Sequence, residues 1–167
     1  VDIPHDWLIY DTNNLYEDSE GWYRKTFDMQ TETGVRYALR FDGVYMEPVV
    51  YVNGAKAGEW KYGYNTFEID ITDYLVNGAN EIRVQVMHRS PNSRWYSGAG
   101  IFRNIWFKTM PDTHFVSDGI YIRTERTDAG YMLKVSSEIS GSEFDAVAYT
   151  VFDKNGTAVV SRTTDAA

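Results

Sequence analysis

Acidic and imidazole side chains that could support acid–base chemistry occur at three places: His5 and Asp6, Glu68 and Asp70, and Glu17, Asp18 and Glu20. Two carboxyl groups act together when they face each other across a substrate, commonly about 5 to 10 Å apart. Glu68 and Asp70 alternate with apolar residues, which indicates a solvated strand face. Adjacent side chains in an extended chain point apart, so His5 and Asp6 do not form a hydrolytic dyad. We predict no catalytic residue in this chain.

Two stretches, residues 17–23 and 90–100, combine flat aromatic side chains with short polar and planar charged ones. A neutral polyol presents apolar C–H faces surrounded by hydroxyl groups, and this combination of side chains binds both features. The two stretches are therefore predicted to be ligand-binding loops rather than reaction centres.

Strands are the elements that must position these loops. Aromatic residues make up 16% of the 167 residues, a density that favours β-sheets. Apolar and polar residues alternate over residues 35–41, 67–71 and 82–87, as in strands with one buried face. Asn-Gly pairs, which tolerate positive φ and form turns, occur at residues 53–54, 77–78 and 155–156.

Helical periodicity is not sustained over about ten residues anywhere in the sequence. A single helical turn is predicted over residues 72–76, capped by Thr72 or Asp73. The chain is therefore predicted to be all-β, with its strands in sandwiches that bury the aromatic side chains.

A domain boundary is predicted near residues 110–113, where a polar, proline-containing link follows a strand. Residues 1–110 form the first predicted domain and residues 114–167 the second. Predicted strands of the second domain are residues 119–123, 131–139 and 146–152. An immunoglobulin-like sandwich needs roughly 100 residues and seven strands, so we expect a partial one, with residues 157–161 as an unpaired or mispaired edge.

The formal net charge of −8 repels nucleic-acid phosphates and anionic membranes, so neither is a predicted partner. No apolar run in the sequence approaches the roughly 18 residues of a membrane-spanning helix. The lack of cysteine excludes disulfides and zinc–thiolate sites, and the three widely spaced histidines show no metal-ligand pattern. No metal and no other cofactor is predicted.

Five blocks of sequence carry a resemblance to a known family. They are Pro4-His5-Asp6-Trp7, Gly21-Trp22-Tyr23-Arg24, Tyr51-Val52-Asn53-Gly54, Gly78-Ala79-Asn80-Glu81-Ile82 and residues 93–103, Ser-Arg-Trp-Tyr-Ser-Gly-Ala-Gly-Ile-Phe-Arg. In this order they closely resemble the N-terminal sugar-binding domain of family 2 glycoside hydrolases, the β-galactosidase and β-glucuronidase group. The resemblance covers residues 1–110, and the remainder falls where that family has its immunoglobulin-like second domain.

The resemblance implies a jelly-roll sandwich of the galactose-binding type, an immunoglobulin-like domain and then a (β/α)8 barrel with two catalytic glutamates. By this comparison the chain ends before the barrel and begins after the family's first strand or two. We therefore expect an inert fragment of a β-galactosidase-like enzyme, whose loops help form the sugar subsite of the barrel. The implied partners are a β-linked carbohydrate, bound through the parent enzyme, and the barrel domain in cis. A homo-oligomer is left open.

The resemblance also implies a role for Asp18, because galactosidases of this family use an Asn or Asp three residues before Gly-x-Tyr in the galactose subsite. Arg94 stands where some of these galactosidases carry an acidic residue that binds galactose and sodium, so it implies neither a sodium site nor a galactose preference. The predicted substrate-binding residues are Asp18, Asn92, Arg94, Trp95 and Tyr96.

Structural alternatives exist for the aromatic and charged residues. Trp95 and Tyr96 could pack against neighbours, and Arg94 could stack on them or pair with an acid. Large residues of the strands, namely Trp7, Trp22 and Tyr23, are predicted to pack in the core or between domains. A free-standing carbohydrate-binding or adhesive β-sandwich is the alternative to an enzyme fragment, and the length of the open reading frame distinguishes the two.

Overall fold

The computed structural model describes residues 1–91, 93–141 and 144–165. The chain divides into two compact units, Val1–Met110 and Pro111–Ala167. Among the described residues the only helical elements are two single 3-10 turns, η1 (Leu8–Tyr10) and η2 (Thr72–Tyr74). The all-β prediction is confirmed.

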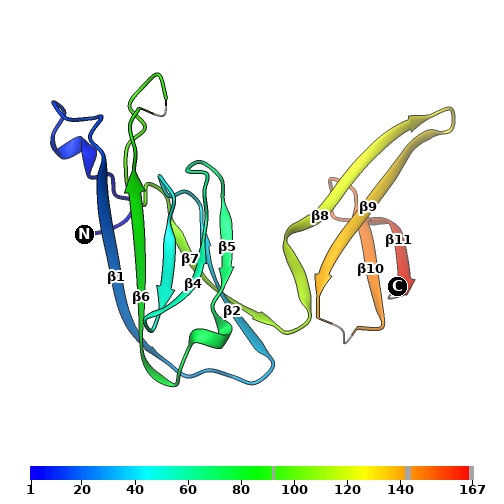
Figure 1. Cartoon of the computed structure of the whole chain (residues 1–167). Coiled ribbons are helices and arrows are strands. Elements are labelled where there is room, and N and C mark those ends of the chain that lie inside the picture. The colour runs from blue at the N-terminus through cyan, green and yellow to red at the C-terminus, as the bar shows by residue number, and fades with distance from the viewer. Residues whose placement is uncertain (92, 142–143, 166–167) are drawn as a thin grey trace. The chain divides into compact units, whose positions relative to one another are not determined.

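The first unit is a sandwich of two sheets (Figure 1). One sheet has the strand order β1-β6-β3-β4, with β1 at Ser19–Met29, β6 at Gly78–His88, β3 at Val49–Val52 and β4 at Ala55–Glu59. The other sheet has the order β5-β2-β7, with β5 at Phe67–Asp70, β2 at Val35–Phe41 and β7 at Ile105–Pro111.

Alternating side chains from both sheets form the hydrophobic core. Buried core residues on the strands are Tyr37, Leu39 and Phe41 of β2, Val50 and Val52 of β3, Phe67 and Ile69 of β5, and Val84 and Val86 of β6. These residues belong to the alternating patterns seen in the sequence, except for the β3 pair, so the predicted inward faces are confirmed. A two-layer core fixes the strands rigidly and leaves their connecting loops at the ends of the sandwich.

The Asn-Gly pair at residues 53–54 makes the tight β3–β4 turn. Asn53 and Gly54 both have positive φ, 50° and 84°, as a type I′ hairpin requires. The Asn53 amide also donates to the Asn80 side chain and to the Tyr74 carbonyl, both at 2.8 Å. Asn80 is only 2% exposed and bonds the backbone of Val76 through both side-chain atoms. The two Asn-containing blocks of the sequence therefore stabilise one turn region.

The predicted turn after β5 forms, but its predicted cap is wrong. Residues Thr72–Tyr74 form η2, and neither Thr72 nor Asp73 caps it. Instead, Asp70 accepts a hydrogen bond from the Thr72 N–H at 2.8 Å, and the Thr72 hydroxyl accepts one from the Tyr37 N–H at 2.8 Å. The hydroxyl of Thr72 therefore connects the turn to β2 instead of capping the turn.

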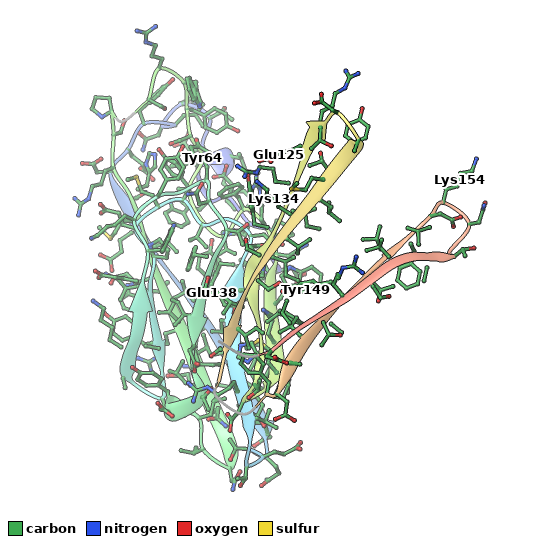
Figure 2. The ribbon with its side chains drawn as sticks, turned by 90° about the vertical axis from the view of Figure 1, so that its right-hand side faces the viewer. Tyr64, Glu125, Lys134, Glu138, Tyr149 and Lys154 are labelled. Carbon is green, nitrogen blue, oxygen red and sulfur yellow. The ribbon has the colours of Figure 1, made fainter. Side chains whose placement is uncertain are left out.

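The second unit contains two antiparallel hairpins (Figure 1). They are β8 (His114–Thr127) with β9 (Gly130–Ser140), and β10 (Ala146–Phe152) with β11 (Ala158–Asp165). The Tyr149 hydroxyl of β10 donates to the Ser137 hydroxyl of β9 at 3.1 Å, with Tyr149 labelled in Figure 2. The expectation that residues 157–161 are unpaired is wrong, because Ala158, Val160 and Ser161 pair with β10.

Candidate functional site

The two stretches predicted to be loops meet at one end of the first unit. The loop prediction is wrong for residues 19–23, which belong to β1, so only residues 17–18 of the first stretch lie in the loop that precedes this strand. Ser19, the first residue of β1, pairs with His88, the last residue of β6. The segment before β1 and the segment after β6 therefore lie together beyond these strand ends (Figure 1). Antiparallel pairing thus brings together two stretches that are far apart in the sequence.

Buried His88 joins the two loops. Its side chain is only 2% exposed, and its Nδ1 atom lies 2.5 Å from the Glu17 carbonyl oxygen. The Nε2 atom lies 3.3 Å from the Ser97 hydroxyl. Sequence reasoning gave His88 no role, although its alternation with Val84 and Val86 would have placed it on the inward face.

Asp18, the residue matched to the galactose subsite, is exposed and contacts the other loop. Its Oδ1 atom accepts a hydrogen bond from the Ser90 N–H at 2.5 Å. Asp18 therefore holds the start of the second loop, a contact that sequence reasoning did not predict. An exposed carboxylate in this position can also accept hydrogen bonds from hydroxyl groups of a ligand.

The second loop presents its charged and aromatic residues to solvent. Arg94 is exposed, Trp95 is 62% exposed and Tyr96 is 42% exposed. Neither ring belongs to the hydrophobic core, which leaves apolar ring surface available to a ligand. Asn92, the remaining predicted binding residue, lies outside the described residues.

Tyr64 supports Trp95 and was missed in the sequence. The two side chains are hydrogen-bonded, and the Tyr64 ring lies 5.0 Å from that of Tyr45 and 6.1 Å from that of Phe102. Burial among these rings is the main reason that the pKa of the Tyr64 phenol is raised. Tyr64, labelled in Figure 2, comes from the β4–β5 connection, so only the tertiary structure brings it to Trp95.

Asp6 and Gly98 fix the backbone at the C-terminal end of the second loop. Asp6 Oδ1 accepts hydrogen bonds from the N–H groups of Leu8 and Ala99, at 3.0 and 2.9 Å. Gly98 has a φ of +72°, and a Cβ atom there would lie 2.5 Å from Asp6 Oδ2. The Asp6 carboxylate therefore serves the loop backbone, which explains its place beside the glycine-rich block.

The acidic pair weighed as a reaction centre consists of ion-paired residues. Glu68 lies 2.8 Å from Lys108, and Asp70 lies 2.7 Å from Arg36. Burial alone would raise the pKa of Asp70, but hydrogen bonds from Thr72 and Arg36 outweigh it and hold the pKa below its usual value. Both carboxylates lie on the outward face of β5, as the alternation predicted, and each also pairs with a cation of the same sandwich.

Of the three large residues predicted to pack, two do so in the first unit. Trp7 and Tyr23 pack against the core. Trp22 is 54% exposed and stacks on Tyr51 at 5.8 Å, so the core alternative is wrong for it, and packing between domains stays a prediction. The outward parity of Trp22 in β1 is the reason, because alternate strand residues face opposite sides.

An apolar cavity of about 600 Å³ lies elsewhere in the first unit. Its lining includes Phe27, Leu39, Ile82, Ile105 and Phe107. Asp2, Arg24 and Lys25 also line it, together with Trp22 and Tyr23. None of Asp18, Arg94, Trp95 and Tyr96 lines this cavity, so the candidate site at the loop end is separate from it.

Within residues 1–91, 93–141 and 144–165, no group of three or more His, Asp or Glu side chains could hold a metal ion. Over the same residues, no helix is long and apolar enough to span a membrane.

Comparison with protein families identifies the first unit. Residues 3–111 match the family described as "Glycosyl hydrolases family 2, sugar binding domain". The chain is 38% identical to β-galactosidase BoGH2A of Bacteroides ovatus over 77% of its own length and 17% of the relative's. It is 34% identical to a β-galactosidase of Thermoanaerobacter pseudethanolicus, over 99% of the chain and 24% of the relative.

Solved structures of similar proteins have the same fold. A glycosyl hydrolase family 2 member from Bacteroides cellulosilyticus matches 98% of this chain at 30% identity, with a TM-score of 0.81 over 24% of that protein. A β-glycosidase from Bacteroides vulgatus matches 98% at 29% identity, with a TM-score of 0.84 over 23% of its chain. The present chain thus spans about a sixth to a quarter of the length of these proteins.

Proposed function

The chain belongs to glycosyl hydrolase family 2, whose sugar-binding domain it matches over residues 3–111, and we propose that it is the non-catalytic N-terminal part of a β-galactosidase-like enzyme. In this proposal residues 1–110 form the sugar-binding domain and residues 114–167 begin an immunoglobulin-like domain. A catalytic barrel in the same protein supplies the acid and the nucleophile.

The observation that carries the proposal is that two connected segments expose the rings of Trp95 and Tyr96 and the carboxylate of Asp18. The Trp95 indole has a partner in the Tyr64 phenol and the Asp18 carboxylate has one in the Ser90 N–H, so both side chains have a contact within the protein before a ligand binds. Preorganised groups bind more tightly because less conformational entropy is lost. Rings that face solvent and a fixed carboxylate suit the C–H face and the hydroxyl groups of a sugar.

A β-galactoside is the substrate class that we favour. The relatives at 38% and 34% identity are β-galactosidases, and an uncharged sugar needs only hydrogen-bonding groups such as Asp18. Arg94 would act on hydroxyl groups at the rim of the subsite.

The test uses the full-length protein and the present chain. We expect the full-length protein to hydrolyse an aryl β-galactoside with a higher kcat/KM than the aryl β-glucuronide, and the present chain to hydrolyse neither. Turnover by the repurified present chain would refute the non-catalytic assignment. A full-length protein that prefers the glucuronide would refute the galactoside assignment.

Asp18→Ala in the full-length protein tests the site itself. A hydrogen bond to a charged group contributes about 1.5 to 3 kcal/mol, so kcat/KM should fall by about 10- to 100-fold. Asp73→Ala is the matched control, because Asp73 is an exposed aspartate in η2, away from the loop end. Equal kcat/KM in both variants and the parent would show that this loop does not contribute to the sugar subsite.

A further inference from the structure

His88 is a buried polar side chain that the proposed sugar subsite does not itself use. Its ring is 2% exposed and lies 6.3 Å from the Tyr45 ring, at an angle of 46° between the planes. A buried imidazole costs free energy unless both ring nitrogens find partners. Both partners of His88 come from the loops, one nitrogen to each.

The partners fix the orientation of the imidazole. The Glu17 carbonyl oxygen can only accept, so Nδ1 of His88 carries the hydrogen and donates it across 2.5 Å. The Nε2 atom then pairs with the Ser97 hydroxyl at 3.3 Å. Rotation of the ring would break both bonds together, so one ring orientation serves both loops.

The atoms held by His88 adjoin the residues of the proposed subsite. Glu17 directly precedes Asp18 in the chain, and Ser97 directly follows Tyr96. The imidazole of His88 thus connects the segment that carries Asp18 to the segment that carries Trp95 and Tyr96. Buried polar networks of this kind specify one arrangement of their members.

We propose that His88 is a positioning residue, whose two hydrogen bonds set the separation between the loop that carries Asp18 and the loop that carries Trp95 and Tyr96. The importance of that separation for sugar binding rests on the proposed function, whereas the mechanical connection does not. No atom of His88 needs to touch the ligand.

Two substitutions separate the two bonds. In His88→Asn the amide nitrogen can take the place of Nδ1 and keep the bond to Glu17, while the bond to Ser97 is lost. In His88→Gln the longer side chain places its polar end near the position of Nε2 and keeps the bond to Ser97 instead. Ser97→Ala removes the same bond as His88→Asn and leaves the imidazole in place, which covers the case in which a His88 variant does not fold.

Amide hydrogen exchange of the present chain is the first measurement. We expect His88→Asn and Ser97→Ala to accelerate exchange at residues 93–97 by about tenfold, with little change at residues 11–18. His88→Gln should give the reverse pattern. Exchange in β2 reports on general destabilisation and should stay the same in all three variants. Equal acceleration of β2 and both loops, or unchanged exchange in both loops, would overturn the proposal.

Kinetics of the full-length protein is the second measurement, and it distinguishes the two proposals. If both hold, the KM for an aryl β-galactoside should rise in His88→Asn and Ser97→Ala, with kcat less affected because the barrel is intact. Loops that exchange faster at an unchanged KM would refute the sugar subsite and support the connection through His88. Loops that exchange as in the parent would refute the connection, whatever the KM.

Discussion

The hydroxyl group of Tyr23 lies 2.7 Å from Nδ1 of His5. The same oxygen accepts a hydrogen bond from the N–H of Ile101 at 3.3 Å. These three residues belong to three of the sequence blocks that resemble the family, so one phenol joins the chain start, β1 and the end of the second loop. These three of the five blocks are therefore adjacent in space, because hydrogen bonds to the Tyr23 hydroxyl connect them.

Tyr23→Phe should lower the free energy of unfolding of the first unit by about 1 to 3 kcal/mol, because it leaves buried groups without a partner. Urea denaturation monitored by tryptophan fluorescence measures the change. Tyr16→Phe is the control, since Tyr16 is 57% exposed and its substitution should cost less than about 0.5 kcal/mol. Equal costs in the two variants would mean that the hydroxyl of Tyr23 has no stabilising role.

Gly100→Ala should lower the Tm of the first unit more than Gly54→Ala does. Both glycines have positive φ, +131° and +84°, so alanine is strained at each, at a cost of about 1 to 2 kcal/mol in the left-handed region. At Gly100 the new Cβ would also lie 2.5 Å from the His5 carbonyl and the Tyr23 hydroxyl, whereas nothing lies within 4 Å at Gly54. Thermal unfolding of the two variants side by side provides the comparison, and a lower Tm for Gly54→Ala would contradict it.

Alkaline pH should destabilise the first unit. Burial is the main cause that raises the pKa of the Tyr23 and Tyr64 phenols above 10.0. Between the unfolded and folded pKa values the native state binds more protons, so the free energy of unfolding falls as pH rises. The contribution is complete below about pH 10 and is lost through the folded pKa. Urea titrations across this range should show a smaller loss for Tyr23→Phe, and an equal slope in the parent and the variant would count against it.

Tyr64 and Trp95 should be coupled in the full-length protein. Tyr64→Phe removes the partner of the Trp95 indole, and we expect kcat/KM for an aryl β-galactoside to fall by about two- to tenfold. In a Trp95→Phe background, where the indole N–H is already absent, the same change should have little further effect. Additive losses in the double variant would show that the two residues act independently.

The second unit should exchange its amide hydrogens faster than the first. All buried core residues of the described chain lie within residues 1–110, whereas all eight residues of β11 are exposed. Few buried contacts mean a low free energy of local opening. We expect the amides of β9 to exchange at least about 100-fold faster than those of β2. Equal protection would show that the second unit is stabilised by contacts beyond its own hairpins.

Period-2 alternation was enough to place Leu39, Ile69 and Val84 in the core, because one buried face per strand is a local property of the sequence. The same reasoning could not find the connection through His88, since a lone histidine at a strand end has no distinctive pattern. Tyr64 and Trp95 come from different strand connections, so their contact depends on how the sheets are ordered. The large ring of Trp22 suggests a core position, but its parity on β1 points it outward, and residue type alone does not reveal that parity.

The hydrogen bonds of the Asn53 amide make the stability of the first unit sensitive to deamidation during storage. Asparagine followed by glycine is prone to deamidation, which replaces the NH2 group with an oxygen. At Asn53 that nitrogen donates to Asn80 and Tyr74, so an aspartate here would place acceptor against acceptor. Asn155 has no such role for its side-chain nitrogen among the described contacts, and only its backbone N–H bonds Asp153. Protein with an aspartate at residue 53 should therefore unfold more easily than protein with one at residue 155, a difference that thermal unfolding of the Asn53→Asp and Asn155→Asp variants would reveal.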